Sequence, residues 1–475
     1  MVSGLPVVVV IGVTLAAFVV VGVRASRRDT DVEDYVVARN SQGAATLGLS
    51  FLAAGMGAWI LFAPPEVGAG VGMIGVAGYA AGAAAPFAVY GLLGPRIRSV
   101  LPAGHSLPEF LRLRFGRGFS TYVGVISVLY MLFFVMAELT AIGAVVGILS
   151  GAKPVFVILG VTIATLAYTT LGGLRASLVT DRFQAWLILA LLGAAAYVVL
   201  GSDAAASGAP AAAAPVGAPI RVGVEVAVTL IIAVTAANMF HQGYWQRVWA
   251  ARDDRSLRVG TVVGAVTTIP VVALLGYLGY LAAARGLELG TPPAPFFAGI
   301  GGAPEWVALP VLILALALVS SSVDTLQTGL ASILIAERRG LSLRTARVIT
   351  VVLMVPAVLV ALQGFSVLRL FLIADLLCAA TVVPALASLW SRATTGGALA
   401  GAVAGLLGAA GAGALSAGAI SGVELVTMPG AVPTLPPFLG ALIASAVVTV
   451  LVSLASRRTV DLESLGAQVP ALSPR

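Results

Sequence analysis

Thirteen apolar runs, most of them about 20 residues long, occupy about two thirds of the chain. A helix of about 20 apolar residues is long enough to cross the ~30 Å hydrocarbon core of a bilayer. Charged residues make up 10% of the 475 residues, against about 25% in soluble domains, which excludes a soluble enzyme. We therefore predict an all-α, polytopic membrane protein. Its predicted transmembrane helices cover residues 5–23, 44–64, 70–93, 119–149, 153–171, 176–200, 223–244, 259–283, 306–336, 345–362, 366–390, 396–418 and 437–455.

The arginine residues gather in every second loop between these runs, whereas the opposite loops hold only Lys153, Arg221 and Arg285. Short cytoplasmic loops attract Arg and Lys. We therefore predict a multi-pass protein of the cell membrane, with its N-terminus outside and its C-terminus in the cytoplasm. The same distribution accounts for the net charge of +7 without a nucleic-acid partner.

A run of three serines, Ser320 to Ser322, lies near the middle of the apolar segment 306–336, and Asp324 follows closely. Polar groups at this depth are costly unless they are paired, and they often mark ion or substrate pathways. Clustered small oxygens without a basic neighbour favour a bound cation. The alternative is hydrogen bonding between helices.

The second predicted helix contains residues that interrupt helices. Gly55 and Gly57 flank Met56, and Pro65 lacks a backbone donor. Within lipid, freed carbonyls are tolerated only where protein, water or an ion satisfies them. A discontinuous helix is one interpretation, and a glycine face for close helix packing is the other.

The seventh predicted helix holds a comparable interruption, because residues 238–244 are polar and aromatic. Interrupted helices at matching places in two halves point to the binding site of an inverted-repeat transporter. We therefore predict a five-plus-five core with one repeat at 44–200 and a second at 223–391. The segment 1–43 would add a span and a cytoplasmic loop, and the segment 396–475 two peripheral spans and a short tail.

Several short motifs occur in order along the chain. They are Asp34–Arg39, Ser106–Leu111 (SLPEFL), Tyr168–Ser177 (YTTLGGLRAS) with Thr180, Asp181 and Gln184 behind it, Trp245–Arg247, and the serine run. Together they resemble the sodium/solute symporter family, which includes proline, pantothenate and sugar symporters. The resemblance extends from about residue 34 to residue 396.

The resemblance implies a ten-helix inverted-repeat core with a co-transported sodium ion between the second and ninth spans. Sodium is a hard cation that suits carbonyl and hydroxyl oxygens, and a neutral set of ligands binds weakly enough to release it. Asp181 would lie on the inward exit path of the ion. Carried over by position, the ligands would be the carbonyls of Ala53, Met56 and Leu318 and the hydroxyls of Ser321 and Ser322.

The solute site is less specific in the sequence. Proline-type members of the family carry an acidic residue where this chain has Gly55, so no particular solute is assigned. Aromatic and polar groups near the two interruptions are the candidates, with core packing as the alternative for each. These candidates are Gly57, Trp59, Glu138, Phe240, His241 and Tyr244.

We therefore expect a sodium-coupled secondary active symporter, and not an enzyme, that imports a small polar organic solute by alternating access. An amino acid or a carboxylate would fit this class. One alternative is a proton-coupled symporter with Glu138 as the relay, although Glu138 could equally make a structural bond to a serine, a threonine or a freed backbone group. The other is a transporter-like membrane sensor that acts through a separate partner.

Overall fold

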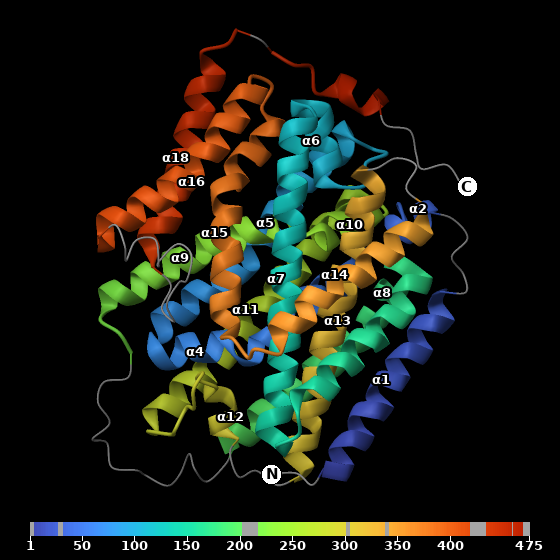
Figure 1. The fold of residues 1–475 in the computed structure, drawn as a ribbon, viewed down its shortest axis with the longest axis vertical. Helices are drawn as coiled ribbons and strands as arrows, with labels where there is room; N and C mark the ends of the chain where they lie inside the picture. Colours follow the sequence, from blue (N-terminus) through green and yellow to red (C-terminus); the bar gives the residue numbers. More distant parts are fainter. Residues whose placement is uncertain are drawn as a thin grey trace.

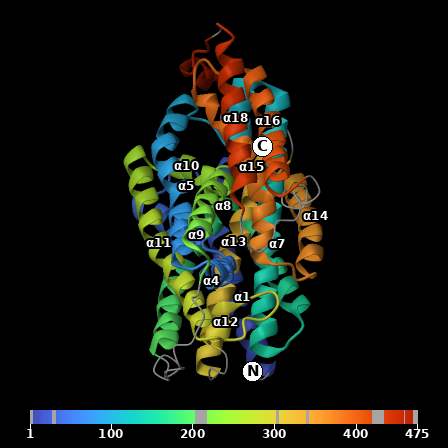
Figure 2. The same cartoon turned by 90° about the vertical axis from the view of Figure 1, so that its left-hand side faces the viewer.

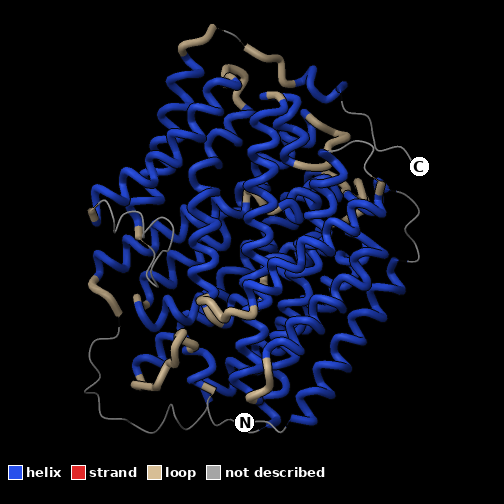
Figure 3. The backbone as a smooth tube through the Cα atoms, in the orientation of Figure 1, coloured by secondary structure: helices blue, strands red, loops and turns tan. Residues whose placement is uncertain are grey.

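The computed structural model describes residues 4–26, 32–201, 217–300, 305–337, 342–418, 434–457 and 459–468. Within these residues the secondary structure is helical, and the tube drawing shows helices joined by short loops (Figure 3). Parts of the arginine-rich loops used to predict the orientation, at 27–31 and 338–341, lie outside the described residues. The predicted all-α class is confirmed.

The helices follow one another through the chain (Figure 1). They are α1 (Gly4–Ser26), α2 (Val32–Val36), α3 (Ala44–Gly55), η1 (Ala58–Leu61), α4 (Ala63–Gly70), α5 (Met73–Val100), α6 (Leu107–Phe115), α7 (Arg117–Ser150), α8 (Pro154–Gly201), α9 (Ile220–Asn238), α10 (Gln242–Ala250), α11 (Asp254–Ala284), α12 (Pro295–Gly299), α13 (Glu305–Glu337), α14 (Leu343–Ala361), α15 (Val367–Leu386), η3 (Ala387–Leu389), α16 (Thr395–Ala417), α18 (Leu435–Leu454) and η4 (Glu463–Gln468).

Polar N-caps fix where several of these helices begin. A capping side chain accepts a hydrogen bond from an orphan amide of the first turn. The caps are Ser106 on α6, Asp253 on α11, Ser342 on α14, Ser366 on α15 and Thr394 on α16. Each cap directly precedes a helix and lies in a loop or turn between two helices.

The described residues hold up to twelve candidate spans, which is close to the thirteen predicted. Eleven described helices are long and apolar enough to cross a membrane, and the bent pair of Ala44–Gly55 with Ala58–Gly70 forms a twelfth. The long helix α8 is broken at Gly173, where φ is 52° and ψ is −144°. This left-handed conformation favours glycine, and a Cβ there would collide with Tyr35. The break divides α8 into two stretches that match the predicted helices 153–171 and 176–200.

Both predicted helix interruptions are present. Helix α3 ends at Gly55, and the chain continues through η1 into α4 at an angle of 58°. Helix α9 ends at Asn238, and α10 begins at Gln242 after three residues outside either helix. The glycines around Met56 therefore mark a broken helix and not merely a packing face.

The buried centre of the molecule consists mainly of α7, α13 and α15. The broken helix α3 packs against α8, α11 and α13, so the interruption at Met56 faces protein on several sides. At the periphery α1 runs beside α8, while α16 and α18 pack on each other and on α15 (Figures 1 and 2). The bounds of the two inverted repeats stay a prediction.

A buried histidine cluster joins α2 to the segment that precedes α6. His105 Nε2 lies 2.9 Å from Glu33 Oε2, and its Nδ1 lies 3.0 Å from Glu109 Oε2. Arg39 also pairs with Glu33. Burial lowers the pKa of His105, but the hydrogen bonds and charges of the two carboxylates outweigh burial and raise the pKa above its ordinary value.

Candidate functional site

The interruption of α3 leaves backbone groups that need partners. The last bond of its helical ladder runs from Met56 N to Leu52 O, so the Ala53 carbonyl lies beyond that ladder. On the far side of the break, Ala58 N donates to Glu138 Oε2 at 2.6 Å, and Trp59 N donates to Glu138 Oε1 at 3.5 Å. Glu138 therefore satisfies the amides that the break exposes.

Gly57 is required beside that carboxylate. Any Cβ at this position would overlap the side chain of Glu138. Both residues are buried, and Glu138 has no solvent-exposed surface. The structure thus shows Glu138 bonded to backbone amides that the break sets free.

The serine run lies in α13, which packs against α3 and η1. Leu318, Ser321 and Ser322 are all fully buried. Ser321 Oγ donates to Asp181 Oδ1 at 2.8 Å. Within the described residues, Ser322 Oγ and Ser320 Oγ have no hydrogen-bond partner. A hydroxyl that gives its proton to a carboxylate keeps its lone pairs free to accept from a donor or ligate a cation.

Asp181 joins four helices at one point. Its Oδ2 accepts from Ser50 Oγ at 2.6 Å and from Arg247 at 2.7 Å, while its Oδ1 accepts from Ser321. Arg247 further donates to Ser50 Oγ at 2.7 Å, and also to the Gly243 carbonyl and the Thr325 hydroxyl. Asp181 and Arg247 are completely buried. We call Ser50, Asp181, Arg247 and Ser321 the Asp181 network.

Asp324 has its own set of donors immediately beside this network. Tyr168 donates to Asp324 Oδ2 at 2.7 Å, and Ser177 donates to Oδ1 at 2.8 Å. Thr180 adds a bond of 3.2 Å. Asp324 therefore holds α13 against both sides of the Gly173 break in α8.

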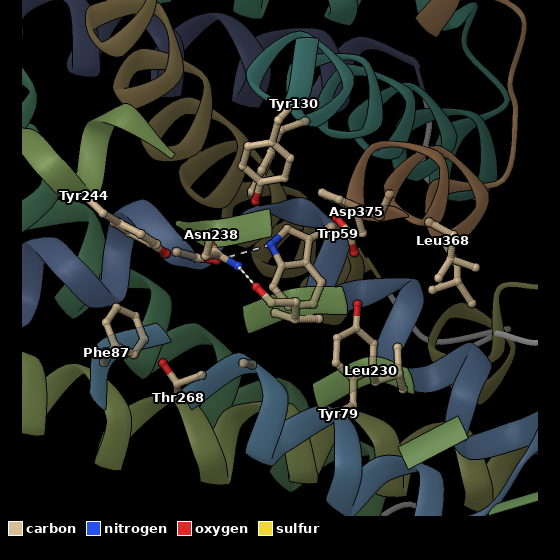
Figure 4. Close-up of a pocket in the computed structure, with 16 residues that line it drawn as sticks. Trp59, Tyr79, Phe87, Tyr130, Leu230, Asn238, Tyr244, Thr268, Leu368 and Asp375 are labelled. Atoms are coloured by element: carbon tan, nitrogen blue, oxygen red, sulfur yellow. Dashed lines mark hydrogen bonds between the residues drawn. The ribbon is translucent and has the colours of Figure 1, made fainter. Parts of the chain in front are cut away.

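A pocket lies next to the break in α3 (Figure 4). Small-molecule sites commonly combine a few polar groups with a mostly apolar lining. Its polar lining consists of Asn238, Thr268, Asp375 and three tyrosine hydroxyls, and the remaining lining is apolar. The aromatic side chains of the lining are Trp59, Tyr79, Phe87, Tyr130, Phe134, Tyr244 and Phe371.

Trp59 connects the cavity to the broken helix. Its indole Nε1 donates to the Gly55 carbonyl at 3.2 Å (Figure 4). The ring stacks on Tyr79 with a centroid distance of 5.6 Å and meets the edge of Phe371 at 6.0 Å. The orientation of this ring therefore depends on the backbone one residue before Met56.

Two of the six candidate solute residues, Trp59 and Tyr244, line the cavity. The other four do not belong to its lining. Gly57 and Glu138 lie against each other at the break. Phe240 is packed in the core, and the ring of His241 stacks on Tyr244 with a centroid distance of 4.4 Å.

Several lining residues did not stand out in the sequence. Tyr79, Tyr130, Phe134 and Phe371 lie in ordinary apolar runs, where aromatic residues usually signify packing. Asp375 did carry a signal, since it is an acidic residue inside a predicted span, but nothing in the sequence connects it with a cavity. The sequence marks Arg247 as part of a motif of the resembling family, but it does not show that Asp181 is the partner of Arg247.

The chain is similar in sequence to known transporters. A model of the sodium:solute symporter family matches residues 35–284. A spermidine transporter of Candida albicans is 30% identical over 393 residues, which cover 79% of this chain and 74% of that protein. An osmoregulated proline transporter of Bacillus subtilis is 28% identical over 197 residues, or 39% of each protein.

Solved transporter structures share the fold. A sodium-coupled sialic acid symporter in a substrate-bound, outward-open state gives a TM-score of 0.73 at 14% identity, covering 96% of this chain and 98% of that one. Mhp1, a nucleobase-cation-symport-1 family transporter in a closed conformation, gives 0.59 at 15% identity, covering 92% and 98%. The architecture is thus the LeuT-type fold of a transporter. The family model covers more than half of the 475 residues, and the chain belongs to the sodium:solute symporter family.

Proposed function

We propose that this protein is a sodium-coupled symporter that brings a small polar organic solute into the cell by alternating access. It would lie in the cell membrane with its N-terminus outside and its C-terminus in the cytoplasm. Family membership and the transporter fold support solute transport. The alternation of arginine-rich and arginine-poor loops supports the orientation.

The sodium ion would bind between α3 and α13, to the carbonyls of Ala53, Met56 and Leu318 and the hydroxyls of Ser321 and Ser322. The observation that carries this proposal is that buried oxygens from both helices lack donors there. The Ala53 carbonyl lies beyond the α3 ladder, and Ser322 Oγ has no partner within the described residues. Ser321 gives its proton to Asp181 and so keeps lone pairs for an ion.

The solute would occupy the cavity beside Trp59. The bond from Trp59 Nε1 to the Gly55 carbonyl supports coupling, because an ion at Met56 would hold the same turn of backbone that orients the indole. By thermodynamic linkage, the solute would then raise the affinity for sodium by the factor by which sodium raises the affinity for the solute. The names of the relatives make spermidine and proline the first solutes to test.

Release to the cytoplasm would require the Asp181 network to open. Asp181, Arg247 and Ser50 link α8, α10 and α3 in the buried state. Separation of these helices would expose Asp181 to water on the exit path of the ion. The bound ion would oppose that separation by bridging α3 and α13.

The test is uptake into proteoliposomes. With a confirmed solute, an inward sodium gradient should drive accumulation, and an equal potassium gradient should not. Ser321→Ala and Ser322→Ala should each raise the sodium concentration for half-maximal uptake about tenfold, which corresponds to ~1.4 kcal/mol. Ser320→Ala is the matched control, since it removes a neighbouring buried hydroxyl outside the proposed ligand set. Uptake that ignores the sodium gradient would refute the proposal.

The proton-coupled alternative stays open to a separate test. The backbone bonds of Glu138 favour a structural role, because both of its oxygens already accept from amides. Glu138→Gln keeps one acceptor oxygen but has no acidic proton to relay. Concentrative uptake by this variant would exclude Glu138 as the relay, whereas loss of accumulation with binding intact would support it. A sensor role would appear as solute binding without transport.

A further inference from the structure

A single carboxylate lies in the wall of an otherwise uncharged cavity. Asp375, on α15, is only 5% exposed and lines the cavity together with Trp59 and Tyr79. Its carboxylate and the Tyr79 hydroxyl both point toward the space beside the Trp59 indole (Figure 4). Among the described lining residues, Asp375 is the one that carries a formal charge.

This carboxylate has no partner of its own. No hydrogen bond or ion pair within the described part of the chain involves Asp375. By contrast, the other acidic groups in the buried centre, Asp181, Asp324 and Glu138, each accept at least two hydrogen bonds. A buried carboxylate without a partner is strongly unfavourable. A cationic ligand would supply the missing charge.

The aromatic wall suits the same kind of ligand. Trp59 stacks on Tyr79, Phe371 meets Trp59 edge to face, and Phe134 packs on Phe371 at 4.9 Å. The faces of such rings carry negative electrostatic potential and attract ammonium groups within about 6 Å of the ring centre. The apolar side chains of this wall also suit the alkyl part of an amine.

We propose that the solute of this cavity is an organic ammonium ion that lacks a carboxylate, with Asp375 as its counterion and Trp59, Tyr79 and Phe371 as its aromatic wall. The inference rests on the proposed function, since it names the solute class for the same cavity. On this proposal the Asp375 side chain makes the cavity prefer cationic solutes over zwitterionic ones.

The rest of the lining argues against a zwitterion. A basic group binds a solute carboxylate most strongly, and the described lining holds no Lys, Arg or His and offers only neutral donors. The side-chain amide of Asn238 already donates one hydrogen bond to the Val234 carbonyl. A second carboxylate close to Asp375 would also be repelled. Thr268 and Asn238 instead offer isolated polar contacts for a hydroxyl or a second amine.

The experiment compares ligands of one shape and different charge. Binding to the purified full-length protein in detergent is measured by isothermal titration calorimetry. Choline is compared with 3,3-dimethyl-1-butanol, its neutral carbon isostere, and with glycine betaine, which adds a carboxylate to the same trimethylammonium group. In the same way n-butylammonium is compared with 1-butanol. We expect each cation to bind at least tenfold more tightly than its neutral or zwitterionic counterpart.

Variants then test the counterion. Asp375→Asn should weaken cation binding tenfold or more, and Asp375→Glu should keep most of it. Glu225→Gln is the control, because Glu225 is a carboxylate of α9 that pairs with Arg221 outside the cavity lining, and this variant should bind like wild type. The wild-type comparison of choline with its carbon isostere decides the charge question even where Asp375→Asn fails to fold.

Failure of this inference differs from failure of sodium coupling. Equal binding of choline and its isostere, or Asp375→Asn binding choline like wild type, would overturn the ammonium assignment while sodium-driven uptake of another solute could stand. Conversely, Asp375-dependent binding of ammonium ions, with uptake that ignores the sodium gradient, would support the assignment and refute the coupling.

Discussion

The Asp181 network offers the sharpest quantitative test, through a double-mutant cycle on Asp181 and Arg247. Arg247→Met removes the guanidinium, which makes four hydrogen bonds at 2.7–3.1 Å and has no exposed surface. The Asp181 carboxylate then stays buried without its cation. Removing one partner of a buried ion pair typically costs about 3–5 kcal/mol, and Asp181→Asn should cost a similar amount because it strands the guanidinium.

The double variant leaves neither charge stranded. Replacing both members of a buried pair by neutral groups of similar volume is often nearly neutral, although Ser50 and Ser321 still lose a charged acceptor. We therefore expect the double variant to be about 3 kcal/mol more stable than the sum of the single effects predicts. Equilibrium unfolding in mixed micelles of dodecylmaltoside and SDS, followed by near-ultraviolet circular dichroism, gives the free energies.

Arg221 and Glu225 provide the matched control, since they form an exposed pair one helical turn apart on α9 with an N–O distance of 2.9 Å. Exposed pairs contribute about 0–1 kcal/mol, so Arg221→Met should change the free energy of unfolding little. Additivity of the Asp181 and Arg247 effects within ~0.5 kcal/mol would refute the reasoning. So would an Arg247→Met variant that costs no more than Arg221→Met.

Two further predictions concern other parts of the structure. The pKa of His105 is raised in the folded protein. The stabilisation from its contacts is therefore complete below the unfolded pKa of about 6.5 and is lost as the pH rises through the higher folded pKa. Thermal unfolding between pH 6 and pH 9 should show this loss of stability, and His105→Gln should flatten the dependence of stability on pH. Gly57→Ala should abolish uptake and lower thermal stability, because its Cβ would displace the Glu138 carboxylate from Ala58 N. The buried amide would then lack a partner, which costs ~1–3 kcal/mol of stability. Gly70→Ala is the control, because a Cβ there meets nothing within 4 Å, and equal activity of the two variants would contradict this account.

Local chemistry explains which features were predictable from the sequence. The break at Met56 follows from glycines and prolines within one short segment, and the interruption at 238–244 from polar residues inside an apolar run. The bounds of the spans follow from apolar length in the same way. Each of these signals lies within about 20 consecutive residues, so no knowledge of distant contacts is needed.

The contacts that make up the site are of another kind. Glu138 meets Ala58 across 80 residues, and Arg247 meets Asp181 across 66. The sequence shows Glu138, Asp181 and Arg247 only as polar residues in or near apolar spans, and many hydrogen-bond partners could satisfy each of them. Asp375 shows the limit most clearly, because a lone acid in a helix gains its meaning only from aromatic side chains that other helices bring around it.

The way Asp181 is bound also determines how the helices that meet at this residue could separate. Its three donors come from α3, α10 and α13, and all of them are sealed from water. If a single helix withdrew, the remaining charges would lose a partner before any water arrived to replace it. Such half-open arrangements are higher in free energy than either the sealed form or a fully hydrated one. Opening should therefore behave as an all-or-none event, with no populated state in which only one of the three helices has moved.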